Sequence, residues 1–221
     1  MRIEDYAIIG DTQTLALVGI NGAIDWLCFP RFDSGACFAS LLGSEENGRW
    51  LLAPKGEATS VRRRYRDGTL ILETEFKTPE GTARVVDYMP IRGKNPDVVR
   101  IVEDVSGVVP MRSELVIRFD YGSIVPWVRK EHGRLQAIAG PDALVLESPL
   151  RHEGRGFTSV SEFEVKPGDR VPFVLTWYPS HERAPESPDP FEALTETERW
   201  WRGWASKASD QGEYREQIVR S

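Results

Sequence analysis

Two carboxylates, Asp25 and Asp33, stand out in this sequence because they interrupt its most apolar stretch. A pair of carboxylates can hydrolyse a glycosidic bond, provided that they flank the bond and that one has a raised pKa. The alternation of a β-strand places Asp25 on the same face as Leu27 and Phe29, where a carboxylate needs hydrogen-bond partners. Arg31 and neighbouring backbone amides are the expected partners, so a structural role for Asp25 is favoured over a catalytic one.

The loop that follows, Pro30–Phe38, mixes aromatic, charged and turn-forming residues. Aromatic rings can stack on the apolar face of a sugar, while arginine and aspartate side chains bind hydroxyl groups. The loop could therefore contact a sugar or a neighbouring domain, but an Arg31–Asp33 pair could equally tie it to its own fold. The candidate substrate-binding or domain-interface residues in this region are Asp25, Trp26, Phe29, Arg31, Phe32 and Asp33.

Other catalytic chemistry has no signature in the sequence. It contains neither a glycine-rich phosphate loop nor a Gly-x-Ser-x-Gly turn, and His132, His152 and His181 are widely separated. The only cysteines, Cys28 and Cys37, are too few for a four-ligand zinc site or a disulfide framework, and their apolar neighbours predict buried free thiols. We therefore predict no catalytic residue, no metal site and no cofactor in this chain.

Charge and hydropathy narrow the classes of partner. The 221 residues carry a net charge of -6 with acidic and basic side chains mixed, which disfavours binding to nucleic acid. The one basic run, at residues 62–66, is short enough to be a solvated strand edge. No stretch approaches the roughly 20 apolar residues of a membrane span, and the opening residues show no apolar leader, so the cytoplasm is the expected location.

The elements that must position the candidate residues are predicted to be strands. From residue 6 to residue 178, short β-branched and aromatic runs alternate with turn signals, which is typical of consecutive antiparallel strands. In the clearest hairpin, Asn21-Gly22 should form a type I′ turn, and the second strand should place Ile24, Trp26 and Cys28 on one face. We predict an all-β domain over residues 1–180, built as a large two-sheet antiparallel sandwich.

A linker and a helix are predicted after this sandwich, over residues 181–209. Residues 179–188 are proline-rich and polar, and Asp189-Pro190 is a good start for a helix that runs to about residue 206. The helix carries Trp200, Trp201 and Trp204, which either cover the open end of the sandwich or form a second docking surface. Residues 210–221 are expected to begin a helical domain that is cut off here.

The sequence resembles the trehalase-like N-terminal domain of bacterial and archaeal proteins of glycoside hydrolase family 15. The resemblance is carried by the runs IEDYAIIGD at residues 3–11, NGAIDWLCFPRFDS at 21–34 and CFASLLG at 37–43. It continues at residues 48–50, 65–66, 72–74 and 87–90 and in the last residues of the chain, so that it covers almost the whole sequence.

This resemblance implies a sandwich of the sugar-mutarotase type that precedes a toroid of paired helices. The two catalytic glutamates of the family belong to that toroid, beyond residue 221, so this chain would be the non-catalytic part of an inverting α-glucoside hydrolase of trehalase or glucoamylase type. Its partners would be its own C-terminal catalytic domain and a small oligosaccharide such as trehalose or maltodextrin. Two alternatives remain open: a free-standing sugar-binding module, and a mutarotase-like enzyme, which needs a histidine and a carboxylate in one cleft.

Overall fold

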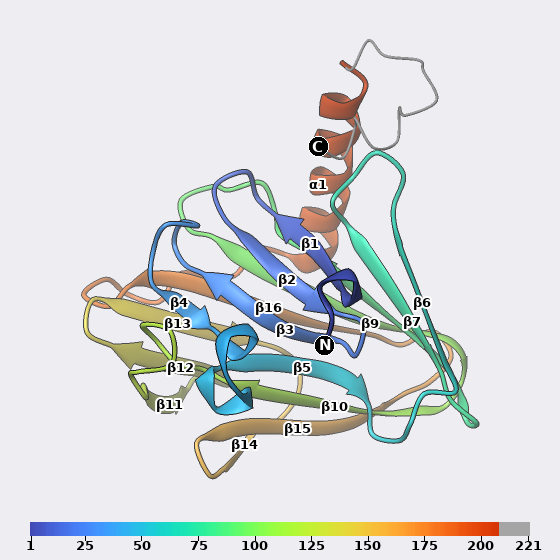
Figure 1. Cartoon of the computed structure of the whole chain (residues 1–221), viewed down its shortest axis with the longest axis horizontal. Helices are drawn as coiled ribbons and strands as arrows, with labels where there is room; N and C mark the ends of the chain where they lie inside the picture. Colours follow the sequence, from blue (N-terminus) through green and yellow to red (C-terminus); the bar gives the residue numbers. More distant parts are fainter. Residues whose placement is uncertain (208–221) are drawn as a thin grey trace.

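Two antiparallel sheets and one C-terminal helix make up the part of the chain that the computed structural model describes, residues 1–207 (Figure 1). The first sheet contains β1 (Tyr6–Gly10), β2 (Leu15–Gly19), β3 (Ala23–Cys28), β4 (Ala36–Phe38), β5 (Arg49–Pro54), β10 (Val109–Val116), β14 (Glu153–Arg155) and β15 (Thr158–Val165). The second contains β6 (Ser60–Tyr65), β7 (Leu72–Lys77), β8 (Gly81–Tyr88), β9 (Asp97–Gly107), β11 (Trp127–Glu131), β12 (Arg134–Ala139), β13 (Asp142–Glu147) and β16 (Arg170–Pro179). Short 3-10 turns lie at Ile3–Asp5, Ser40–Leu42 and Glu45–Asn47, and the predicted two-sheet antiparallel sandwich is confirmed.

The main core fills the space between the two sheets. In β8, the strand alternation points Ala83 and Val85 into this core, while Val86 and Tyr88 face the outer side of the second sheet. Trp50 of the first sheet and Phe173 of the second sheet pack edge to face, with 6.2 Å between their ring centroids. The sandwich therefore has an apolar layer outside the second sheet in addition to the core between the sheets.

A buried ion pair lies inside the main core. Arg100 of β9 donates to both carboxylate oxygens of Asp87 on β8, at 2.7 and 3.2 Å, and neither side chain is more than 1% exposed. The same guanidinium donates to the carbonyls of Trp50 and Gly22 in the first sheet, each at 2.8 Å. Because its charge is paired and four of its hydrogen bonds are made, this arginine joins the two sheets without an unsatisfied charge.

The helix α1 (Pro190–Ala205) covers the outer apolar layer with its first half only. Asp189 caps its N-terminus by accepting from the amides of Phe191 and Glu192, as the sequence predicted. Ala193 and Leu194 pack against outward-facing apolar residues of the second sheet and against Ile71 just before β7; the sheet residues are Val86, Tyr88, Val99, Ile101 and Val174. The second half of α1 rises beyond the sheets at the upper right of Figure 1.

The turn of the first hairpin differs from the predicted type I′ turn. Gly22 donates its amide to the carbonyl of Gly19, so Ile20 and Asn21 are the central residues, and only Gly22 has a positive φ, of 84°. A Cβ atom at Gly22 would lie 2.5 Å from the carbonyl oxygen of Leu52, so glycine is required there for close packing as well as for conformation. A type I′ turn would need positive φ at both of its central residues.

A β-bulge overturns the predicted alternation in β3. Leu17 pairs with Trp26 but Val18 pairs with Ile24, so Asp25 is an extra residue in the strand. Ile24 consequently joins Leu27 in the main core, whereas it was expected to share the face of Trp26. The bulge thus lets both Ile24 and Leu27 point into the main core.

Two smaller sequence predictions concern the cysteines and the basic run. Cys28 and Cys37 are buried free thiols, as expected, and burial raises the pKa of each. The basic run forms β6 at the edge of the second sheet, but it is more than a solvated edge. Arg63 donates to the backbone carbonyls of Asp5 and Val18 at 2.7 and 3.1 Å, which ties this edge to the first sheet.

Candidate functional site

The loop after β3 presents an exposed cluster of three side chains. Arg31 and Asp33 form an ion pair at 3.0 Å with both side chains more than half exposed, and Phe32 between them is 67% exposed. The hydrogen bond from Arg31 lowers the pKa of Asp33, so this carboxylate is charged at neutral pH. Phe29, by contrast, is buried in the main core and serves as the anchor of the loop. Arg31, Phe32 and Asp33 are thus the residues that can meet a ligand or a domain.

Asp25 has partners other than the predicted Arg31. Its carboxylate accepts from the hydroxyl of Tyr6 at 2.8 Å and from that of Ser40 at 2.7 Å. The bulge turns Asp25 away from the core, toward β1 and the 3-10 turn that carries Ser40, and this geometry explains the difference. Burial, together with the hydrogen bond to Asp25, raises the pKa of Tyr6, so its hydroxyl remains a donor. The predicted structural role of Asp25 fits these bonds.

Trp26 lies apart from the exposed loop cluster. Its ring is half-buried against Cys28, Ala36 and Ala39, and its centroid lies 6.0 Å from that of Tyr121. Of the six candidate residues in this region, the structure therefore gathers three at the surface of the loop and places the other three in packing or hydrogen-bonded positions beneath it.

The tryptophans of α1 form a second exposed cluster. Trp201 meets Trp200 and Trp204 edge to face, with centroids 4.9 and 6.2 Å apart, so the three rings brace one another. Trp200 is 38% exposed and Trp204 is 47% exposed, while Trp201 is half-buried. The second half of α1, which carries these rings, is fixed to the sandwich by Glu198, which accepts a hydrogen bond from Arg66 of the loop after β6 at 2.8 Å.

In Figure 1 the tip of the β1–β2 hairpin lies between the loop after β3 and α1, the two segments that carry the exposed clusters. On one side, Phe32 donates its amide to the carbonyl of Gln13. On the other, Arg92 donates to the buried carboxylate of Asp11 at 2.8 Å and to the side chain of Gln13 at 3.2 Å. The loop that carries Arg92 borders a cavity that Trp200 also lines. Both clusters therefore belong to one loop-bearing end of the sandwich.

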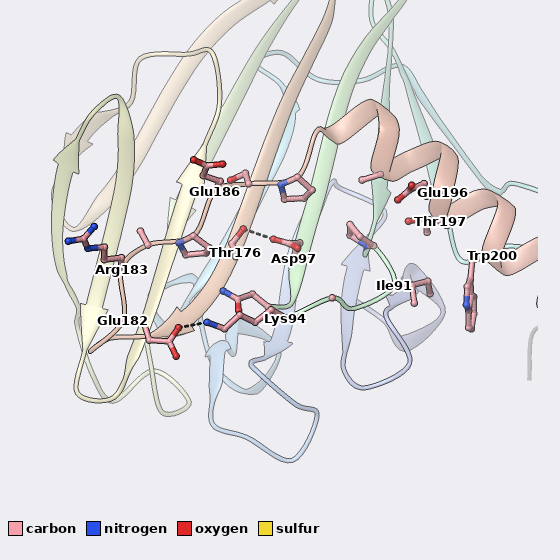
Figure 2. A pocket seen from close by; sticks show the side chains of 18 residues that line it. Ile91, Lys94, Asp97, Thr176, Glu182, Arg183, Glu186, Glu196, Thr197 and Trp200 are labelled. Atoms are coloured by element: carbon pink, nitrogen blue, oxygen red, sulfur yellow. Dashed lines mark hydrogen bonds and ion pairs between the residues drawn. The ribbon is translucent and has the colours of Figure 1, made fainter.

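This cavity holds a carboxylate that sequence reasoning missed. Its volume is about 690 Å³, and it lies between the loop after β8, the linker before α1 and the helix itself (Figure 2). Asp97 accepts a hydrogen bond from Thr176 within it. Burial raises the pKa of Asp97 to about 6; the nearby Asp11 adds to this shift, and the bond from Thr176 opposes it. The sequence held only a weak signal for this site, a carboxylate that opens an apolar strand.

The remaining chemistry of the described residues supports no metal or histidine site. His152 is buried, and its ring nitrogens bond to the hydroxyls of Ser148 and Ser161, not to a carboxylate. Within residues 1–207, no group of three or more histidine, cysteine or carboxylate side chains could hold a metal ion. No helix in that range is long and apolar enough to cross a membrane.

Comparisons with known proteins show that the chain is similar in sequence to part of several trehalases. A family model described as trehalase-like, N-terminal, matches residues 1–182. A trehalase of Thermoplasma volcanium is 30% identical over 229 aligned positions, which cover 100% of this chain and 36% of the trehalase. A trehalase of Mycobacterium tuberculosis is 31% identical over 232 positions, which cover 91% of this chain and 33% of that protein. The chain spans about a third of the length of these relatives.

A solved structure shows the same fold. A bacterial glucoamylase complexed with acarbose superposes with a TM-score of 0.62 at 11% sequence identity, over 90% of this chain and 37% of that chain. At this identity the likeness concerns the fold alone.

Proposed function

The chain belongs to the trehalase-like N-terminal family, and from that premise we propose that it is the non-catalytic N-terminal domain of an inverting α-glucoside hydrolase, of trehalase or glucoamylase type. The observation that carries the proposal is the family match over the whole sandwich, in a chain that spans only about a third of its trehalase relatives. The general acid and the general base of the reaction belong to a C-terminal helical toroid in the parent protein.

In this proposal the sandwich supports the catalytic domain in two ways. The exposed end of α1, above all Trp204, docks on the helical toroid, because braced aromatic rings at a surface are a typical interface anchor. Arg31, Phe32 and Asp33 reach toward the entrance of its substrate pocket from a loop anchored by the buried Phe29. The substrate is a small α-glucoside such as trehalose or maltodextrin. The protein acts in the cytoplasm.

The test compares this chain with its full-length parent. The parent should release glucose from trehalose or maltose, and the 221-residue chain, with a cooperative melt, should release none. In the parent, Arg31→Ala and Asp33→Ala should each lower kcat/KM by more than about tenfold and leave the melting temperature unchanged.

Arg155→Ala is the matched control for these variants. Arg155 and Glu153 form a pair of the same spacing at 3.2 Å, with similar exposure, on the edge strand β14. This variant should keep full activity. The pocket-shaping role would be wrong if Arg31→Ala retained normal activity, or if Arg155→Ala lost as much. Turnover by the chain alone, abolished by replacing one of its carboxylates, would contradict the non-catalytic assignment.

A further inference from the structure

The cavity beside α1 has the dimensions of a small-molecule site. Its volume of about 690 Å³ lies within the range of roughly 300–1,000 Å³ that is typical of ligand pockets. It lies over the outer ends of β9 and β16, where Asp97 and Thr176 pair across the two strands. An ion pair of 2.6 Å between Lys94 and Glu182 joins the loop after β8 to the linker, so two walls of the cavity are held together (Figure 2).

An unpartnered hydroxyl lies in the linker wall. The Oγ atom of Ser187 is buried and has no hydrogen-bond partner among the residues that the structure describes. Leaving a buried polar atom without a partner is costly. Asp97 nearby has one bond from Thr176 and further acceptor capacity on its carboxylate.

An aromatic ring closes one end of the cavity. Figure 2 shows Trp200 at that end, next to Ile91. Its edge-to-face contact with Trp201, at 4.9 Å, holds the ring in place, while 38% of the residue stays exposed. A fixed and partly exposed indole offers an apolar surface for stacking at little entropic cost.

The charges in the cavity exclude anionic ligands. Lys94 is neutralised by Glu182, and the other lining charges are Asp97, Glu186 and Glu196 against Arg183. An excess of carboxylates repels phosphate or sulfate but accepts hydrogen bonds from hydroxyl groups. We propose that this cavity is a binding site for a neutral monosaccharide or disaccharide, which stacks on Trp200 and donates hydroxyls to Asp97. The site lies on this chain alone and does not depend on the proposed role in hydrolysis.

The experiment is a calorimetric titration of the 221-residue chain with trehalose and with maltose. We expect saturable binding of at least one sugar with a Kd on the order of 1 mM, which is a weak but measurable affinity. Trp200→Ala should weaken this binding by about tenfold or more. Trp127→Ala is the control, because Trp127 is 68% exposed on β11 and does not line the cavity, and it should leave the Kd unchanged.

Ser187→Ala provides a second test that leaves the helix intact. It should weaken sugar binding without lowering the melting temperature, because it removes a hydroxyl of a lining residue that has no hydrogen-bond partner among the described residues. Equal losses of affinity in Trp200→Ala and Trp127→Ala would overturn the assignment of the cavity. Absence of saturable binding in a cooperatively folded chain would also overturn it, as would tighter binding of inorganic phosphate than of either sugar. None of these outcomes bears on whether the full-length parent hydrolyses a glucoside.

Discussion

Two arginine–aspartate pairs show how differently the interior and the loop-bearing end of this sandwich are built. The pair of Arg100 and Asp87 is at most 1% exposed and is completed by two backbone carbonyls of the opposite sheet. The pair of Arg31 and Asp33 is made of the same residue types, but both of its side chains are more than half exposed. Solvent screens the second pair, so its contribution to stability is small.

The difference teaches which of the two pairs is available for function. A buried pair must be satisfied within the fold, and its position therefore reports only on how the sheets are joined. An exposed pair on an anchored loop adds little to the fold, so its side chains are free to contact another molecule. The family resemblance includes both segments, but only the structure separates them.

The largest expected effect tests the interior pair. Arg100→Met leaves the Asp87 carboxylate buried and unpaired, so the free energy of unfolding should fall by about 3–5 kcal/mol, as measured by urea denaturation. Arg31→Met is the matched variant of the exposed pair and should not change the free energy of unfolding. The double variant Arg100→Met/Asp87→Leu should recover part of the loss, because it leaves no buried charge. A loss below about 1 kcal/mol in Arg100→Met would remove the contrast between the pairs.

The same contrast exists within α1. Leu194, in the first half, is 5% exposed and packs on the second sheet, so Leu194→Ala should lower the free energy of unfolding by about 2–3 kcal/mol. Trp204, in the second half, is 47% exposed, so Trp204→Ala should cost less than about 1 kcal/mol despite the larger side chain. Chemical denaturation of the two variants measures both values. A loss in Trp204→Ala that equals the loss in Leu194→Ala would show that the tryptophans stabilise the sandwich and need no partner.

The sequence predicted features that depend on neighbouring residues. The two-sheet architecture follows from short apolar runs between turn signals, and the start of α1 follows from Asp189, whose side chain caps the helix. The free cysteines were likewise expected from their apolar neighbours. These signals are local, so a single sequence contains them.

Features that depend on distant segments were missed. The bulge at Asp25 is set by pairing with β2, and the partners of Asp25 come from Tyr6 and Ser40, which strand alternation could not reveal. Arg100 stands in an apolar strand, and nothing near it in the sequence indicates its bonds across the sandwich. The cavity around Asp97 is assembled from three separate segments of the chain. Tertiary packing decides such features, and local pattern does not.

The smallest expected effect concerns Asp97, a partly buried carboxylate whose exposure lies between that of the buried Asp87 and that of the exposed Asp33. Its pKa in the folded chain is raised from 3.8 to about 6, so the unfolded chain loses this proton first as the pH rises. Between these two values the folded chain binds more protons at this site than the unfolded chain, and its contribution to stability therefore decreases with increasing pH.

Asp97→Asn removes the charge and keeps an acceptor for the hydroxyl of Thr176. We expect this variant to be more stable than the native chain at pH 7, by about 1 kcal/mol, because Asp97 is partly open to solvent and the full shift is screened. The advantage should shrink as the pH falls to 4, where the native carboxyl is protonated in the folded chain and only partly ionised in the unfolded chain. Thermal melts of the two proteins from pH 4 to pH 7 measure the difference, with Asp33→Asn as an exposed control that should show no such gain on raising the pH. If Asp97→Asn is less stable at pH 7 than at pH 4, relative to the native chain, the fold favours the ionised carboxylate. Asp97 would then resemble the satisfied Asp87 and would not be a carboxylate with room for a ligand.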